Sequence, residues 1–348
     1  MKIVVVGNMG YVGPVLIAHL RARFPQAELI GYDSGWFGHC LTTACVVPER
    51  NLNAQVFGDV RDLPSDLLQG VDAVVMLAAV SNDPMGSRFE NPTKEINFQS
   101  SVEIAQKAAA AGVSHFVYAS SCSVYGFAEG GARKETDPLN PLTAYARSKI
   151  DTEKALSKTD LGKMTVTCLR FATACGMSDR VRLDLVLNDF VACALSTGVI
   201  TVLSDGTPWR PLIDVHDMAR AIEWGVTRDA GNGGSFLTVN VGSAQWNYQV
   251  KDLAAAVVEE MPGSSYSINK DAPPDKRSYQ VDFGLFRQLA PQHQPTKSLQ
   301  DSVRDLRDGL RAINFANADF RNSDQIRLRV LDRHIREGRI DENLRWVG

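Results

Sequence analysis

Tyr145 and Lys149 are the two residues whose types and spacing most directly indicate chemistry. They are four positions apart in a stretch (143–157) typical of a helix, and residues i and i+4 share a helix face. An ammonium close to a phenol favours the phenolate, so we expect the pKa of Tyr145 to fall below its usual value of about 10. Such a tyrosine can exchange a proton with an alcohol while a hydride moves. The same spacing occurs on solvated helix faces, so it needs support from other motifs.

A group of small hydroxyl residues precedes this helix. Residues 119–126 read Ala-Ser-Ser-Cys-Ser-Val-Tyr-Gly and lie at the end of a predicted strand. In an open α/β sheet, ligands bind at the carboxyl ends of the strands. A serine there can hydrogen-bond the reacting hydroxyl beside Tyr145.

The segment Gly7-Asn8-Met9-Gly10-Tyr11-Val12-Gly13 follows a predicted strand and opens a predicted helix. Glycines permit a tight turn and let backbone N–H groups approach a pyrophosphate at the helix N-terminus. Asp33 ends the next predicted strand, 20 residues after Gly13, where a carboxylate can accept hydrogen bonds from an adenosine ribose. It would repel a 2′-phosphate, and no arginine follows it closely. The pattern therefore predicts NAD rather than NADP; the alternative is a tight turn without a ligand.

The elements that must position these residues alternate between strand and helix patterns. Continuous apolar runs predict strands at 2–6, 28–33, 71–77, 114–119, 164–170 and 235–241. Helical patterns occur at about 11–23, 92–111, 143–157, 299–312 and 324–339. Continuous rather than alternating apolar strands favour a parallel sheet that is covered on both faces. We therefore expect an α/β fold, a doubly wound parallel (Rossmann) sheet with a smaller mixed C-terminal substrate lobe.

The expected domain organisation follows from where this alternation weakens. Residues 1–176, with a return at about 212–247, form the predicted NAD-binding domain. Residues of about 177–211 and 248–320 form the predicted substrate-binding lobe, and 321–348 form a helical tail to which the sequence assigns no role.

Composition excludes several other classes of protein. The 348 residues carry 37 Lys+Arg and 40 Asp+Glu, a net charge of −3, which gives no electrostatic case for nucleic acid or an anionic membrane. No apolar run reaches the roughly 18–20 residues that span a bilayer, and the N-terminus is interpreted as a strand rather than a signal peptide.

The histidines show no metal-ligand spacing, so we expect no metal. Without a C-x-x-C pair or a secretion signal, we expect reduced thiols and a cytoplasmic protein; the cysteines are Cys40, Cys45, Cys122, Cys168, Cys175 and Cys193.

Taken together, the chain from residue 2 to about 312 resembles the extended short-chain dehydrogenase/reductase superfamily, in the branch of NAD-dependent nucleotide-sugar epimerases and dehydratases. The motifs that carry the resemblance stand in the family's order. They are Gly7-x-x-Gly10-x-x-Gly13, Gly58-Asp59-Val60-Arg61-Asp62, Leu77-Ala78-Ala79, Asn97, Ser120-Ser121-x-x-Val124-Tyr125-Gly126, Tyr145-x-x-x-Lys149, Leu169-Arg170 and Arg210-Pro211-Leu212-Ile213-Asp214-Val215-x-Asp217.

The resemblance implies a role for each catalytic residue. Tyr145 is the acid/base, Lys149 tunes it and holds the nicotinamide ribose, and Ser121 is the hydroxyl partner, although Ser120 or Ser123 could take that place. Asp59 and Val60 would border the adenine, and Phe171 would lie near the nicotinamide. The full set of expected cofactor contacts is Gly7, Met9, Gly10, Tyr11, Val12, Gly13, Asp33, Asp59, Val60, Leu77, Ala78, Ala79, Asn97, Ser120, Tyr145, Lys149 and Phe171. Asp59 could instead cap a short helix, and Phe171 could belong to the core.

The substrate side is assigned by analogy alone. Arg210 is placed to hold a diphosphate, where a guanidinium can bind two oxygens at once, unless it is a surface turn residue. The other expected substrate contacts are Ser81, Asn82, Ser121, Cys122, Ser123, Thr173, Asn188 and Arg277. Thr173 stands where the family has an asparagine, which puts one substrate contact in doubt.

Departures from the family patterns narrow the chemistry. The 4,6-dehydratases carry an Asp-Glu pair where this chain has Cys122 and Ser123, and the glutamate of the UDP-glucuronate decarboxylases is also absent from this loop. The 3,5-epimerases use a cysteine two residues after the catalytic serine, a place that Ser123 occupies. Cys122 is one residue too early for that role and fits better as a buried, inert thiol.

With these chemistries disfavoured, the remaining chemistry is hydride transfer at a secondary alcohol. The main hypothesis is an NAD-dependent nucleotide-sugar epimerase, at C4, that acts through a keto-sugar. The alternatives are a nucleotide-sugar dehydrogenase or ketoreductase, a C3/C5 epimerase or dehydratase, and a non-catalytic NAD-binding protein. The resemblance also implies a homodimer formed through the helices at 92–111 and 143–157, unless the alanines of 105–111 pack against the sheet.

Overall fold

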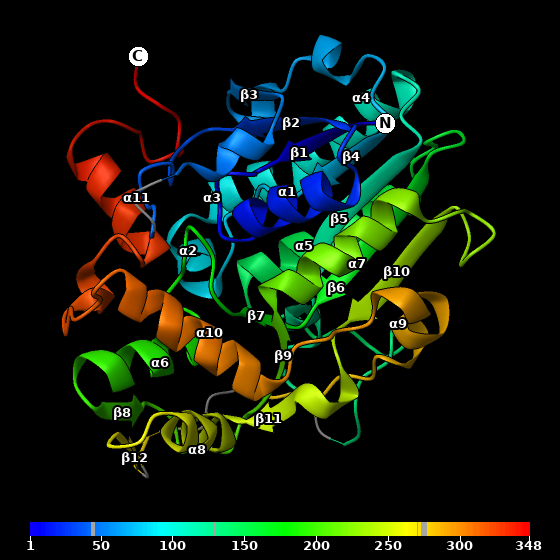
Figure 1. Cartoon of the computed structure of the whole chain (residues 1–348). Coiled ribbons are helices and arrows are strands. Elements are labelled where there is room, and N and C mark those ends of the chain that lie inside the picture. The colour runs from blue at the N-terminus through cyan, green and yellow to red at the C-terminus, as the bar shows by residue number, and fades with distance from the viewer. Residues whose placement is uncertain (43–45, 129, 270, 273–276) are drawn as a thin grey trace.

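The computed structural model describes residues 1–42, 46–128, 130–269, 271–272 and 277–348. In this part of the chain seven strands, all parallel, form one central sheet (Figure 1). In sheet order they are β10 (Phe236–Val241), β6 (Thr165–Phe171), β5 (His115–Ser121), β4 (Ala73–Met76), β1 (Lys2–Val6), β2 (Glu28–Asp33) and β3 (Ala54–Phe57). The doubly wound parallel fold that the sequence predicts is confirmed.

The connections between strands are mainly helical. The helices are α1 (Val12–Arg23), α2 (Asp83–Arg88), α3 (Glu90–Thr93), α4 (Ser100–Ala110), α5 (Ala144–Leu156), α6 (Val186–Ser196), α7 (Val215–Thr227), α8 (Val250–Glu260), α9 (Gly284–Leu289), α10 (Leu299–Ala312) and α11 (Arg327–Arg336). Among the described helices, none is long and apolar enough to cross a membrane.

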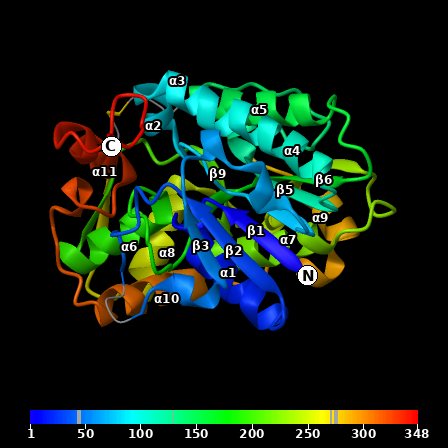
Figure 2. The same ribbon diagram turned by 90° about the horizontal axis from the view of Figure 1, so that it is seen from above.

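Both faces of the sheet are buried. Successive side chains of a strand point to opposite faces, so Ile3 and Val5 of β1 belong to the core beneath α1 and α7, whereas Val4 and Val6 belong to the core on the α4 side. Figure 2 shows α1 and α7 on one face and α4 and α5 on the other. This two-sided burial explains why the strands read as continuous apolar runs.

The sequence predicts one regular helix at 92–111, and the structure contradicts this regularity. The chain forms α3, then a wider π-helical stretch at Lys94–Gln99, and only then α4. Asn97 lies in the wide stretch, where its carbonyl accepts hydrogen bonds from the hydroxyls of Ser101 and Thr152. Such interruptions of a helix are frequent at functional sites, and this one aims the Asn97 side chain at the chain after β4.

Segments that follow the sixth strand build a second, smaller lobe. It contains a mixed sheet of β11 (Asn247–Gln249), β9 (Trp209–Asp214) and β7 (Thr173–Cys175), and a parallel pair of β12 (Ser265–Ile268) with β8 (Val199–Val202). A separate core unites α6, α8 and α10, with Leu187, Leu253 and Leu306 fully buried in it. The lobe stands over the carboxyl ends of the central strands, and its residue bounds stay a prediction.

The C-terminal residues return to the first domain. After α10 the chain forms α11, and a bridge joins Ile340 to Trp346 near the end. Figures 1 and 2 place α11 and the C-terminus beside α2 and the β2–β3 side of the sheet. The tail therefore lies against the predicted cofactor-binding domain.

Candidate active site

The turn after β1 is as tight as the glycine motif predicts. Gly7 has φ +89°, and a Cβ on it would lie 2.4 Å from the Ala78 nitrogen. A Cβ on Gly13 would lie 1.9 Å from the Asn8 carbonyl oxygen. Asp33 accepts hydrogen bonds from the Met9 nitrogen at 2.9 Å and the Gly35 nitrogen at 2.7 Å. The Asp33 carboxylate thus holds the turn in place, and it also lines a cavity above the sheet.

Gly13 supplies a prediction that requires no substrate. We expect Gly13→Ala to push α1 away from the turn, lowering the free energy of unfolding by about 1–3 kcal/mol and weakening NAD binding. Urea unfolding and calorimetric titration with NAD measure the two effects. Gly131→Ala is the matched control, because its φ is unstrained and a Cβ there meets no atom within 4 Å. Equal behaviour of the two variants would contradict the close packing of the turn.

A cavity of about 630 Å³ lies between the carboxyl edge of the sheet and the second lobe. Most residues that the sequence assigns to the cofactor line it: Gly7, Gly10, Tyr11, Val12, Asp33, Asp59, Val60, Leu77, Ala78, Ala79, Ser120, Tyr145, Lys149 and Phe171. The indole Nε1 of Trp36 is buried on this wall without a hydrogen-bond partner. A cradle of glycines, an acidic residue and an unsatisfied donor fit an adenine dinucleotide.

Three expected cofactor contacts do not line the cavity directly. Met9 and Gly13 support the turn. Asn97 is fully buried; its side chain accepts from the Val80 nitrogen at 2.8 Å and donates to the Val80 oxygen at 3.0 Å. Asn97 therefore positions the chain after β4, whose residues Leu77 to Ala79 form the cavity wall.

Asp59 and Phe171 each have both of the roles that the sequence analysis gave as alternatives. Asp59 caps the short 3₁₀ turn Val60–Asp62 and pairs with the Arg61 guanidinium at 2.6 Å, yet it also lines the cavity. Phe171 is buried in the core and lines the cavity too.

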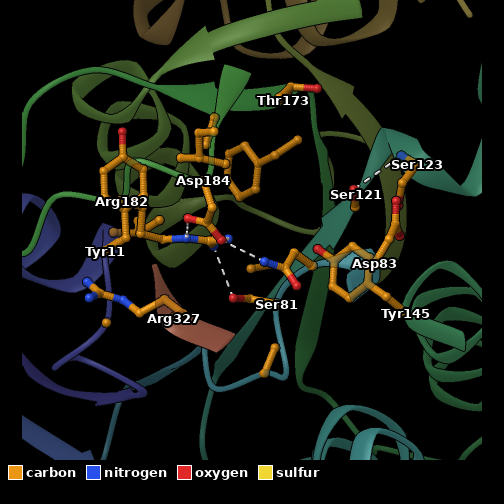
Figure 3. Close-up of a pocket in the computed structure, with 18 of the residues that line it drawn as sticks. Tyr11, Ser81, Asp83, Ser121, Ser123, Tyr145, Thr173, Arg182, Asp184 and Arg327 are labelled. Carbon is orange, nitrogen blue, oxygen red and sulfur yellow. Dashed lines mark hydrogen bonds and ion pairs between the residues drawn. The ribbon is translucent and has the colours of Figure 1, made fainter. Parts of the chain in front are cut away.

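Tyr145, at the start of α5, faces the opposite end of the cavity from Tyr11 (Figure 3). Removal from water raises the pKa of Tyr145 to about 12, and a hydrogen bond with Ser121 and the charge of Arg182 only partly oppose this rise. The expected fall in the pKa of Tyr145 is therefore contradicted. The physical reason is the burial of the phenol, and the Lys149 ammonium does not offset it because it bonds the Ala119 oxygen.

Lys149 is almost completely buried one turn after Tyr145. Its Nζ donates to the Ala119 oxygen at 2.8 Å and stands 5.6 Å from the centre of the Tyr145 ring. Burial lowers the pKa of Lys149 to about 7, while the Glu153 carboxylate one further turn along raises it. The lysine therefore depends on Glu153 to keep its charge.

Behind these residues lies a buried ion pair. Glu153 and Arg170 approach to 2.7 Å with both side chains 6% exposed, and the Ser120 hydroxyl donates to the same carboxylate. Ser120 is thus engaged with Glu153, whereas Ser121, whose hydroxyl accepts from the Ser123 nitrogen at 3.1 Å, is the serine that lowers the pKa of Tyr145. This arrangement favours Ser121 as the hydroxyl partner.

The expected substrate contacts divide into two groups. Those that line the cavity are Ser81, Asn82, Ser121, Ser123, Thr173, Arg210 and Arg277. The Ser123 hydroxyl is buried without a partner, which leaves it available to a ligand. The Arg277 guanidinium pairs with Asp83 at 2.9 Å, and Arg210 donates to the Trp209 oxygen at 2.9 Å.

Cys122 and Asn188 do not line the cavity, so their expected substrate contacts are not supported. The Cys122 thiol is fully buried, donates to the Arg170 oxygen, and has a pKa that burial raises. It is the inert thiol of the alternative interpretation. Asn188 is also fully buried and accepts from the Gly176 nitrogen at 3.0 Å, so it holds the loop after β7. The cysteines that the structure describes are free and buried, and Cys45 lies outside the described residues.

Sequence reasoning missed a polar network in the middle of the cavity (Figure 3). Arg182 forms a bidentate pair with Asp184 at 2.9 and 2.8 Å and donates to the Ser81 hydroxyl at 3.0 Å. The Asn82 amide donates to the same Asp184 carboxylate at 2.7 Å. Arg182 falls within the predicted substrate-binding lobe (about 177–211), but nothing local distinguishes it from a surface arginine.

The cavity thus joins a glycine turn at one end to a serine, a tyrosine and a lysine at the other, above a doubly wound sheet. This is the arrangement of the extended short-chain dehydrogenases/reductases, and the chain is an NAD-dependent enzyme of that class. The model of the "NAD dependent epimerase/dehydratase family" matches residues 3–242, and the chain belongs to that family.

Individual relatives agree with this assignment. The chain is 26% identical over 317 residues to an uncharacterized UDP-glucose epimerase, YtcB, of Bacillus subtilis, covering 87% of this chain and 96% of the relative. It is 25% identical to a UDP-glucose 4-epimerase of Lactobacillus helveticus, over 64% of this chain and 70% of the relative.

Solved structures share the fold at lower identity. The complex of MoeE5 with UDP-glucuronic acid and NAD matches with a TM-score of 0.76 and 22% identity, over 90% of this chain and 99% of that one. The UDP-glucuronic acid 4-epimerase of Bacillus cereus, with UDP-glucuronic acid and NAD, matches with a TM-score of 0.74 and 21% identity, over 90% of this chain and 100% of that one.

Proposed function

We propose that the protein is a C4 epimerase of nucleotide-diphosphate sugars. The observation that carries the proposal is an alcohol-handling set, Ser121, Tyr145 and Lys149, beside which the described part of the chain shows no pair of free carboxylates. Cys122 is buried away from the cavity, and Ser123 offers only a hydroxyl.

The carboxylates nearest the proposed reaction centre are already paired. Asp83 pairs with Arg277 and accepts from the Thr143 hydroxyl at 2.7 Å. Asp184 is held by Arg182, which keeps the pKa of that carboxyl below its ordinary value despite burial. Because guanidinium and hydroxyl groups already occupy the oxygens of both carboxylates, neither is free to give or take a proton at a sugar carbon, which disfavours water elimination and C3/C5 epimerisation.

The proposed chemistry uses the chain's residues for proton transfer and orientation. In its phenolate form, Tyr145 takes the proton of the sugar hydroxyl on its Oη and later returns it, while Ser121 hydrogen-bonds the same sugar oxygen. Lys149 supplies positive charge behind the tyrosine, and Glu153 sustains that charge. Bound NAD supplies a reversible hydride acceptor, so no net oxidation occurs. The cavity must let the keto-sugar present its other face before the proton is returned.

The names of the relatives support a UDP-sugar as the substrate class. Arg210 and Arg277 lie on the same wall and are the proposed contacts of the diphosphate, since guanidinium groups bind phosphate oxygens well. The nearest competing function is a nucleotide-sugar dehydrogenase or ketoreductase, which performs the same first half-reaction but releases the keto product.

An assay in deuterated water separates these chemistries. We expect incubation with a panel of UDP- and dTDP-sugars to yield one C4 epimer, detected by NMR, with no deuterium on the sugar carbons. Carbon-bound deuterium would indicate a C3/C5 epimerase, a product lacking water would indicate a dehydratase, and accumulation of reduced cofactor would indicate a dehydrogenase. Each of the three would refute the proposal.

We further propose a cytoplasmic homodimer that assembles through α4 and α5. Ala105 and Ala108 of the alanine-rich stretch are buried against the sheet, so they serve the core and not the dimer. The proposed interface therefore depends on the outward residues of these helices.

A further inference from the structure

The C-terminal residues 327–346, hereafter the C-terminal strap, contact the loop that follows Asp33. The Trp346 indole Nε1 donates to the Ser34 oxygen at 2.7 Å, and the His334 Nε2 lies 3.0 Å from the Trp36 oxygen. Ser34 and Trp36 both line the cavity. The strap thus bonds the main-chain oxygens of the loop that borders the expected adenosine site.

Arg327 extends this contact into the cavity itself. Its guanidinium stands 4.9 Å from the centre of the Phe37 ring and donates to the carbonyl oxygens of Arg180, at 2.8 Å, and Asp324, at 3.1 Å. Arg327 is 1% exposed and lines the cavity, and no described carboxylate forms an ion pair with it. Burial lowers its pKa to about 10. A buried cation in this setting favours an anionic ligand nearby.

The strap also contacts the opposite wall of the expected adenosine site, which Asp59 forms. The Arg61 guanidinium, which pairs with Asp59, donates to the Asn343 oxygen at 2.9 Å, and Arg345 pairs with Asp62 at 2.5 Å. Asp59 is the residue expected to border the adenine, and it lines the cavity. Both walls of the adenosine end are therefore attached to one distant segment of the chain.

We infer that the C-terminal strap is part of the cofactor site: it completes the adenosine end and slows the release of the bound dinucleotide. Loops that form a binding site bind more tightly when they are held in the bound conformation. The buried Nε1 of Trp36, which has no hydrogen-bond partner in the structure, supports this inference, because the strap fixes the main chain of the residue that carries this unsatisfied donor on the cavity wall. The inference extends the cofactor part of the proposed function and requires no particular sugar.

The test uses the full chain with Trp346→Ala and measures affinity for ADP-ribose by calorimetry, together with NAD retained after gel filtration. Trp346 is 46% exposed, so its loss should leave the fold intact. We expect ADP-ribose to bind about tenfold more weakly, with loss of retained NAD and unchanged affinity for UDP. Glu337→Gln is the matched control, because Glu337 pairs with Arg339 within the strap.

Wild-type affinity for ADP-ribose in Trp346→Ala would overturn the inference. If that variant loses affinity for both ADP-ribose and UDP, it has lost its fold, and Arg345→Gln then decides, since Arg345 is exposed and ties the second wall. Because ADP-ribose is the adenosine end of NAD and its binding is measured without turnover of any substrate, failure of the epimerase assay would leave this result unaffected.

Discussion

Replacing Tyr145 by phenylalanine should lower kcat by about 10²–10⁴-fold while changing NAD affinity little. The phenol is the group whose pKa Ser121 lowers, and its loss removes the only proposed proton acceptor for the sugar hydroxyl. The ring keeps its place beside Lys149, so the shape of the cavity is preserved. Turnover of the identified sugar nucleotide and calorimetric binding of NAD measure the two quantities.

Tyr118→Phe is the matched control for this prediction. The centre of the Tyr118 ring also lies near Lys149, 4.7 Å from its Nζ, but Tyr118 does not line the cavity and its hydroxyl donates to the Asn97 oxygen. We expect this variant to retain most of its activity. If Tyr145→Phe retains it as well, the tyrosine is not the acid/base, and another hydroxyl, such as that of Ser123, must be tested.

The second large effect is expected for Glu153→Gln, which should lower the free energy of unfolding by about 3–5 kcal/mol. The change leaves the buried Arg170 guanidinium without its charge partner, and Arg170 also contacts the Tyr125 hydroxyl at 3.0 Å. It further removes the carboxylate that raises the pKa of Lys149, so the lysine should lose its proton at a lower pH than in the wild type.

Urea unfolding of the variant tests the stability, and the pH profile of turnover tests the lysine. The same substitution at Glu103 is the control, because its pair with Lys107 is an exposed i, i+4 contact worth about 0.3–0.5 kcal/mol. A loss at Glu153 as small as that at Glu103 would show that the buried pair contributes little.

Local patterns are sufficient to predict most strands of the sheet and to select the residues that we propose are catalytic. A parallel strand that is buried on both faces must be apolar throughout, so β1, β2 and β6 are visible as continuous runs. The glycine turn and the Tyr145–Lys149 pair are equally local, because each combines residues within a few positions. Where the pattern is weak the prediction fails: β3 is an edge strand with a polar Gln55 and an exposed Phe57, and it was not predicted.

The pKa of Tyr145 shows a different limit. Spacing correctly places Lys149 one turn away, but only the fold shows that its ammonium is buried and bonded to the Ala119 oxygen. Burial then outweighs the neighbouring charge, which a sequence cannot reveal, because the degree of burial depends on every element that packs around the helix.

The sequence alone determined the class of fold and the cofactor, and it singled out the hydroxyl, phenol and amine that we propose act on an alcohol, because periodic apolar runs and short motifs encode them locally. Tertiary structure decided which polar groups face the cavity. Arg182 meets Ser81 across 101 residues, and Arg61 meets Asn343 across 282. Contacts of this length depend on where the chain folds back, and a buried arginine and a surface arginine look alike until that fold is known.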